Sequence, residues 1–421
     1  MSFVRNKIAS SDSSIRPEWL DKVFAVFLGL YPFLCIYKLV NGLTIGDAIL
    51  ILFFLRYIGR SFGRDGRTIS VIVFIAFVSL SFVKCIYCNP EIINDELASM
   101  TIRWVRVSFY LFAAILLGRN VSCLGLLAKT VVMFSALSTL FLVFQYVAFY
   151  GAGTVVLGRI PGLEIYIDNY SEIDYEKVYS YAFRPCSFFL EPASFVQYAI
   201  VAQSILLFSG YYEKRSRIVL SVLLTFGAIM TTSAQGILYF ALVYAVWLFR
   251  NLKSNITFVF IVVAIAVSIP VLYSSVDSFQ YAVDRLFTSE DASDARLGSY
   301  ALILELDSIG DLFLGQGFGY VPSGEWFSGA VYVLHGIGLL GFLLVCCMFY
   351  QFFRHSDSML SKIICVVFFV MLFGTALFYN YMVFWYFLLI VAFSEGSSST
   401  VQNAAETTRP LKIKSGRGAM L

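Results

Sequence analysis

Apolar runs long enough to cross a lipid bilayer recur along almost the whole chain of 421 residues. Hydrophobic residues make up 59 % of the chain and charged residues only 14 %, whereas soluble domains carry about 25 % charged residues. A helix needs about 20 apolar residues to cross the hydrocarbon core, and it pairs its backbone polar groups within the segment, as lipid requires. The alternation of roughly ten residues typical of a membrane β-barrel is absent. These features predict an all-α polytopic membrane protein.

The runs define about twelve predicted transmembrane helices. Two connectors between them are long, 151–186 and 276–330, and they contain aromatic residues, glycine and mixed charge. We therefore expect both loops to be ordered. The short seventh and eighth spans meet at a small, polar break, 231–236, which we expect to dip into the membrane. The predicted spans are 22–40, 42–58, 68–87, 101–118, 124–149, 187–209, 217–232, 235–249, 256–275, 331–352, 360–378 and 380–395. The resulting division is an N-terminal segment 1–21, a polytopic domain 22–395 and a disordered tail 396–421.

Basic residues gather on alternate connectors. Most of the 30 Lys and Arg residues fall on the two terminal segments and on the connectors 59–67, 119–123, 210–216, 250–255 and 353–359. Because cytoplasmic connectors are enriched in Lys and Arg, this bias predicts cytoplasmic termini and two extracytoplasmic long loops. No short apolar stretch ends in a small-residue cleavage site, so the first apolar run is expected to remain as an anchor.

The strongest cluster of functional residue types lies where the first long loop meets the sixth span. Arg184 precedes Glu191 by seven residues, and Pro192 suits the first position of a helix. Glu191 would then lie beside a helix N-terminus, where the macrodipole favours its charge. Two interpretations stay open: an Arg–Glu pair that fixes the loop to the helix, or a cation and a carboxylate that face one external cavity. Ionisable groups at membrane depth are functional candidates.

Single arginines also occur in the external loops at Arg159, Arg285 and Arg296. The last two are eleven residues apart, about three helical turns, so one helix face can present both. The planar guanidinium fork suits phosphate oxygens; the structural alternative is that each arginine pairs a neighbouring aspartate. Tyrosines of the same loops, including Tyr181 and Tyr300, are candidates to pack against sugar rings or to form an interfacial belt.

Metal, nucleotide and nucleic-acid chemistry is not predicted. Gly315-Gln-Gly-Phe-Gly319 follows no strand and opens no βαβ unit, so we expect a turn rather than a dinucleotide site. The two histidines are too far apart in the sequence to form a zinc site. The external loops carry no paired-acid metal motif, and no basic cluster with interleaved aromatics indicates nucleic acid. Asp47, an acid within an apolar run, is expected to pair with Arg103 or Arg106 in a structural role.

Several motifs follow one another in a recognisable order. They are Arg184-Pro with Phe189-Leu-Glu191-Pro192, the Thr232-Ser-Ala-Gln-Gly236 break, Arg296 in the second long loop, and Gly315-Gln-Gly-Phe-Gly319. With this order and topology, the chain resembles the Wzy-type polymerases of O-antigen and capsule repeat units, within the superfamily that includes O-antigen ligases. The resemblance covers 42–395. Ser328, nine residues and Gly338-Leu-Leu-Gly341 are similar to a ligase signature, but Phe327 stands at the ligase histidine position, which favours a polymerase.

The resemblance implies a metal-independent, GT-C-like glycosyltransferase of the bacterial inner membrane that needs no cofactor. Its donor and acceptor would be undecaprenyl-diphosphate-linked oligosaccharides, joined outside the cytoplasm by transfer of the growing chain to the non-reducing end of a new repeat unit. Arg184, Arg285 and Arg296 would stabilise the departing diphosphate, Glu191 would act as the base, and Arg159, Tyr181 and Tyr300 would bind substrate. Besides the lipid bilayer, a chain-length regulator is a candidate partner.

Two other functions remain as alternatives. An O-antigen ligase would share the donor site and the arginines. A flippase for lipid-linked oligosaccharide would line a central cavity with charge along the spans, whereas this chain concentrates charge in its external loops.

Overall fold

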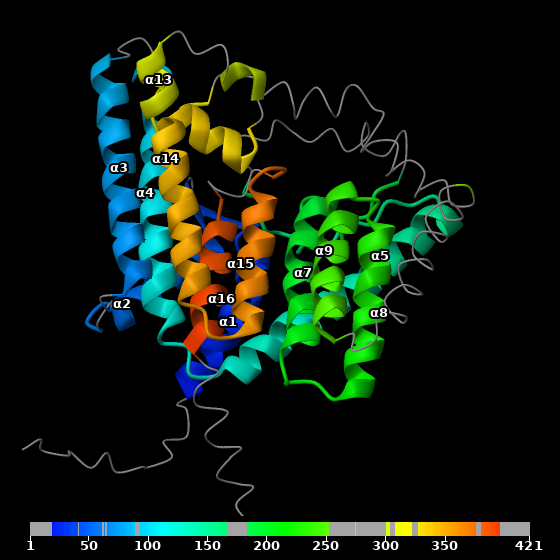
Figure 1. Ribbon diagram of the computed structural model, residues 1–421. Coiled ribbons are helices and arrows are strands. Elements are labelled where there is room, and N and C mark those ends of the chain that lie inside the picture. Colours follow the sequence, from blue (N-terminus) through cyan, green and yellow to red (C-terminus); the bar gives the residue numbers. More distant parts are fainter. Residues whose placement is uncertain are drawn as a thin grey trace, which may run out of the picture.

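The computed structural model describes residues 19–40, 42–60, 63, 65–88, 93–166, 183–251, 274, 300–303, 308–321, 327–375 and 380–395 (Figure 1). Among them are the helices α1 (Trp19–Leu34), α2 (Ile45–Tyr57), α3 (Gly66–Cys88), α4 (Ile93–Gly118), α5 (Leu124–Ala152), α7 (Pro192–Phe208), α8 (Lys214–Met230), α9 (Ala234–Asn251), α13 (Ile309–Leu314), α14 (Gly329–Arg354), α15 (Met359–Met371) and α16 (Met382–Glu395). Strands β1 (Lys38–Val40) and β2 (Leu43–Thr44) pair antiparallel.

The architecture is that of a helical membrane protein. Four helices within the described residues, α3, α4, α5 and α14, are long and apolar enough to cross a membrane, and α7, α15 and α16 are shorter apolar helices. Every predicted span that falls in the described residues overlaps a helix, while the predicted span 256–275 lies almost wholly outside them. The first predicted span was too long, because the chain leaves α1 at Leu34 and turns into the β1–β2 hairpin.

The helices form two groups that pack together through α5 and through the contacts of α15 with α7 and α9 (Figure 1). One group contains α1–α4 and α14–α16, and the other contains α7, α8 and α9. Helix α5 starts beneath the first group, crosses obliquely and packs against α1, α7 and α8. Both groups therefore share one apolar core.

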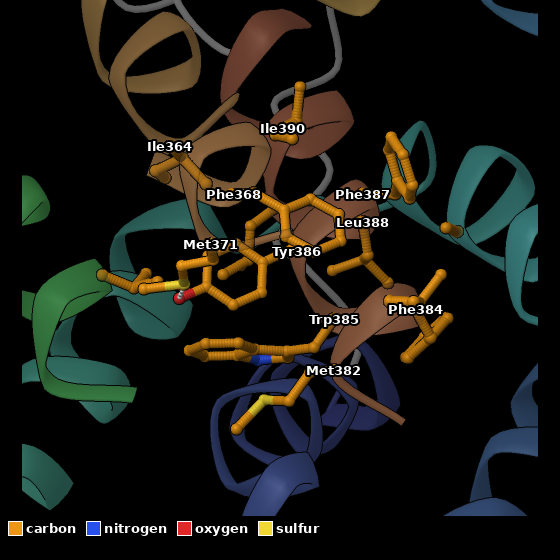
Figure 2. Packing of buried hydrophobic residues seen from close by; sticks show 14 of the residues in the cluster. Ile364, Phe368, Met371, Met382, Phe384, Trp385, Tyr386, Phe387, Leu388 and Ile390 are labelled. Carbon is orange, nitrogen blue, oxygen red and sulfur yellow. Dashed lines mark hydrogen bonds between the residues drawn. The ribbon is translucent and has the colours of Figure 1, made fainter. Parts of the chain in front are cut away.

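Helix α16 forms the centre of this core. Its side chains are buried all round, as expected for a helix without a polar face. Figure 2 shows Trp385 and Tyr386 packed among apolar side chains of the same cluster. The Trp385 ring stacks on Tyr198 of α7 at 4.9 Å between centroids, and the Trp385 Nε1 donates to the Leu28 carbonyl at 2.9 Å. These contacts join α16 to α7 and to α1.

Two pairs of consecutive helices, α8–α9 and α15–α16, are short. α8 and α9 have 17 and 18 residues, and α15 and α16 have 13 and 14. At 1.5 Å per residue these helices are about 20–27 Å long, shorter than the hydrocarbon core of about 30 Å. The α8–α9 break packs against the turn after α15, where Gln235 Nε2 donates a hydrogen bond to the Gly374 carbonyl.

Candidate functional site

The candidate site is built on the segment Phe183–Glu191, here called the arginine loop, at the N-terminal end of α7. Gln145 of α5 holds this loop: its Oε1 accepts a hydrogen bond from Ser187 N at 2.8 Å. The Gln145 Nε2 donates to the Val156 carbonyl of the preceding loop, also at 2.8 Å. The Ser187 Oγ donates to the Ser138 carbonyl at 2.7 Å. One amide side chain of α5 therefore ties two loop segments to the same helix.

Aromatic stacking fixes the same loop on both sides of Arg184 and Cys186. Phe183 stacks almost parallel on Phe149, with 4.2 Å between centroids. Phe188 stacks on Phe141 at 4.5 Å. Stacked rings restrict the backbone on either side of Arg184, so a neutral framework of rings and amides positions this arginine.

The loop brings predicted charged residues together around a buried thiol. Burial raises the pKa of Cys186 to about 11, while the charge of Arg159 lowers it and the charge of Glu191 raises it. Both charges therefore lie within electrostatic range of the same sulfur atom. Arg184 is two residues from Cys186, about 7 Å along an extended chain at most. A Cβ on Gly158 would come within 2.0 Å of the Ser187 carbonyl oxygen, so the segment that carries Arg159 packs directly on the arginine loop.

Glu191 has the helix-start position that the sequence predicted. Its backbone is extended (φ −137°, ψ 152°), it is the N-cap of α7, and Pro192 follows at the first helical position. The Glu191 carbonyl accepts hydrogen bonds from Ser194 N and Phe195 N, but its side chain does not cap the helix. The carboxylate therefore stands beside the positive end of the helix without serving as the cap.

The loop before Arg184 is anchored to the end of α1. Lys38 N donates to the Glu164 carbonyl at 2.9 Å, and Tyr166 N donates to the Ile36 carbonyl at 2.7 Å. Arg106 of α4 donates to the Tyr166 hydroxyl at 2.6 Å and lies over the same ring, 5.2 Å from its centroid. Tyr166 thus has a structural partner in a cation–π contact.

Asp47 has hydroxyl partners that the sequence did not predict. It accepts hydrogen bonds from Tyr31 at 3.0 Å and from Tyr110 at 2.8 Å. Of the two predicted partners, Arg103 instead donates to the Gly319 carbonyl at 2.7 Å, and Arg106 donates to the Gly42 carbonyl at 3.2 Å and to the Tyr166 hydroxyl at 2.6 Å. The acid is satisfied by neutral tyrosines, because these lie on the helix faces next to α2 while Arg103 faces the loop before α14.

A second group of predicted residues meets at the turn after α15. The Tyr300 hydroxyl donates to the Phe373 carbonyl at 3.0 Å and accepts from Ser328 Oγ at 3.3 Å. The next residue, Gly374, is the acceptor for Gln235 of the α8–α9 break. Tyr300, Ser328 and the break are thus neighbours, although they are far apart in the sequence.

Both groups lie at the same end of α7. Gly236 packs so closely on Val196 that a Cβ there would come within 2.9 Å of the valine side chain. Val196 is five residues after Glu191, about 7.5 Å along the helix axis. The α8–α9 break, which contacts Gly374 next to the Tyr300 group, therefore packs on α7 about one and a half helical turns after Glu191.

Gly315–Gly319, here called the glycine loop, is a structural element at a break in α14. Gly338 has φ 67° and ψ −171°, which interrupts the helix. Two carbonyls next to the break accept hydrogen bonds from the loop, His335 from Gln316 N and Gly336 from Gly317 N, each at 2.9 Å. The loop therefore replaces helical hydrogen bonds that the break removes, which agrees with the predicted turn.

The three glycines of this loop also allow close helix contacts. All have positive φ, 72° at Gly315, 135° at Gly317 and 94° at Gly319. Added Cβ atoms would approach Gly336 of α14, Cys85 of α3 and Met100 of α4 to 2.4, 2.2 and 3.0 Å. Glycine is required here for both conformation and space.

Three of the predicted site residues lie outside the described part of the chain, and two residues that hold the site were not predicted. Tyr181, Arg285 and Arg296 lie outside the described residues. Gln145 and Ser187, which hold the arginine loop, were missed; the available signal was a lone glutamine inside an apolar span. Within the described ranges, no group of three or more His, Cys, Asp or Glu side chains is arranged to hold a metal ion.

The described part of the chain thus belongs to the class of helical membrane proteins, with charged side chains gathered where a loop enters α7. Comparisons with protein-family models, with curated proteins and with solved structures found no match.

Proposed function

We propose that this protein is a membrane-embedded polysaccharide polymerase that joins undecaprenyl-diphosphate-linked repeat units. The observation that supports it best is that the backbone next to Arg159 packs on the loop that carries Arg184, where Arg159 and Glu191 both act on Cys186 at the N-terminal end of α7. The Lys/Arg bias supports an extracytoplasmic location for this site and cytoplasmic termini in a bacterial inner membrane. The order of motifs shared with Wzy-type polymerases supports a GT-C-like fold with about twelve spans.

The proposed reaction uses these groups as follows. An acceptor hydroxyl oxygen attacks the anomeric carbon of the growing chain and forms the new glycosidic bond. The bond from that carbon to the diphosphate oxygen breaks, and its electrons leave with the diphosphate. Arg184, with Arg285 and Arg296, stabilises the negative charge on this oxygen, and Arg159 binds the lipid diphosphate. Glu191 takes the proton of the acceptor hydroxyl.

Tyr181 and Tyr300 are proposed to bind sugar rings. For Tyr300 the support is positional, because it contacts the turn after α15, and that turn contacts the α8–α9 break, which packs on the first turns of α7. Its hydroxyl is engaged with Ser328 and Phe373, so we assign any sugar contact to its ring face.

A ligase is the second candidate, and one observation favours it. Ser328 caps α14 and Gly338 breaks it, so the ligase-like spacing coincides with a real structural unit. The two functions differ in their products. A strain that lacks a polymerase shows single repeats on its surface, whereas a strain that lacks a ligase retains lipid-linked polymer.

The direct test is polymerisation by the purified full-length protein with a defined lipid-linked repeat unit. We expect a ladder of products that lengthens with time. A single transfer to a different acceptor would instead identify a ligase, and vectorial transport without new glycosidic bonds would identify a flippase.

A further inference from the structure

Helix α13 presents most of its apolar side chains to the outside of the protein. Ile309 is 78 % exposed, and Leu312, Phe313 and Leu314 are each at least 40 % exposed. The polar residue of the helix, Asp311, faces inward to Lys84. A soluble surface rarely concentrates so many large apolar residues in six positions.

The depth of α13 follows from its attachment to α3. Lys84 Nζ contacts Asp311 Oδ1 at 2.9 Å and the Gly315 carbonyl at 2.7 Å, which fixes the middle and the C-terminal end of α13 to one point on α3. Lys84 is 18 residues after the start of α3 at Gly66, about 27 Å along its axis. The hydrocarbon core is about 30 Å thick. α13 therefore lies at the level of one membrane surface, beside the ends of α3 and α4 (Figure 1).

The outward face of α3 continues toward α13. Leu80 is 68 % exposed, and Val83 and Tyr87 are exposed on the following turns. α3 has the length and hydropathy of a membrane-crossing helix and buries only a minority of its residues within the protein. Its exposed apolar stripe is accordingly a lipid-facing surface, and α13 extends that surface at the level of the headgroups.

We propose that α13 is an interfacial helix whose occupant is lipid, in the leaflet at the Cys88 end of α3. Its apolar side chains insert at the boundary between headgroups and acyl chains, while Asp311 and Lys84 hold it to α3. Because Gly315 directly follows α13, lipid contact would also anchor the glycine loop against the break in α14. This inference does not depend on the proposed enzymatic activity.

Photocrosslinking of the full-length protein in proteoliposomes tests this assignment. p-Benzoylphenylalanine is placed at position 313, and at position 80 as a lipid-facing reference. Position 357, exposed in the connector between α14 and α15, is the matched reference outside a helix. We expect lipid adducts at 313 within about twofold of those at 80, and far fewer at 357.

Three results would overturn the proposal. They are adducts at 313 with other segments of the same chain, adducts with a second protein, or a yield no higher than at 357. If the probe at 313 prevents insertion, the same probe at 309 or 312 gives the same test, because both positions are on the exposed surface. The adducts are measured without polymerase activity, so a failure of the interfacial-helix proposal does not affect the proposed function, and the reverse also holds.

Discussion

The glycine loop and the arginine loop use charge in opposite ways. At the glycine loop, the cations Lys84 and Arg103 donate to the backbone carbonyls of Gly315 and Gly319. At the arginine loop, the hydrogen bonds and stacked rings that hold the backbone come from neutral side chains such as Gln145. Basic residues at the two loops are therefore assigned different roles. Cations that bond a loop backbone stabilise the fold, whereas charged residues in a loop that neutral side chains also hold are the better candidates for chemistry.

The largest expected effect is on the polymerisation activity of a variant in the arginine loop. Arg184→Ala should lower polymerisation by about 100-fold or more, because a fixed cation near the departing diphosphate is lost. The measurement is the product ladder per unit of folded protein. Arg215→Ala, at an exposed position at the start of α8, is the matched control. An unchanged ladder for Arg184→Ala would remove Arg184 from the catalytic proposal.

The complementary change acts on the fold. Gly317→Ala places a methyl group against Cys85 in a backbone conformation that L-residues avoid. We expect a loss of about 2–4 kcal/mol in unfolding free energy, measured by thermal or denaturant unfolding in detergent. Gly310→Ala in α13 meets nothing closer than Ser308 Oγ at 3.6 Å and should be neutral or slightly stabilising. Equal stability of both variants would contradict the role assigned to the glycine loop.

Gln145 tests whether the neutral framework positions the charges. Gln145→Leu leaves the buried Ser187 N–H without its acceptor, at a cost of about 1–3 kcal/mol. Because the arginine loop then shifts, we expect about tenfold lower activity. Thr130→Val on the same helix removes only a hydroxyl that donates to Leu126 O. If Gln145→Leu were as active as Thr130→Val, the clamp would have no part in the site.

The sequence predicted the helical elements better than their ends and partners. Apolar runs fix where a membrane helix must form, so every predicted span within the described residues overlaps a helix. The end of α1 was misplaced because Ile36 and Tyr37 are apolar in either a helix or the strand-like contact with residues 165 and 166. Composition cannot distinguish these two environments.

Tertiary partners were the part that the sequence could not supply. Pro192 predicted the start of α7, because proline has a local preference for that position. Arg103 offered no local sign that it would reach Gly319, more than 200 residues away. The same holds for Gln145 and Ser187. Local chemistry identifies a residue type that needs a partner, but the packing of the helices selects the partner.

The smallest expected effect concerns the Lys84–Asp311 contact beside the glycine loop. The pKa of Asp311 is lowered, first by the hydrogen bond from Ser308 and then by Lys84. The carboxylate therefore stabilises the fold above its unfolded-state pKa of about 4, and this contribution is lost as pH falls through the lower folded-state pKa. Asp311→Asn should reduce Tm by only about 1–2 °C near pH 7, since the pair is partly exposed. The difference from wild type should vanish in acid, whereas Asp357→Asn should match wild type throughout. A larger deficit in acid than at neutral pH would mean that the Asp311 charge does not stabilise the glycine loop.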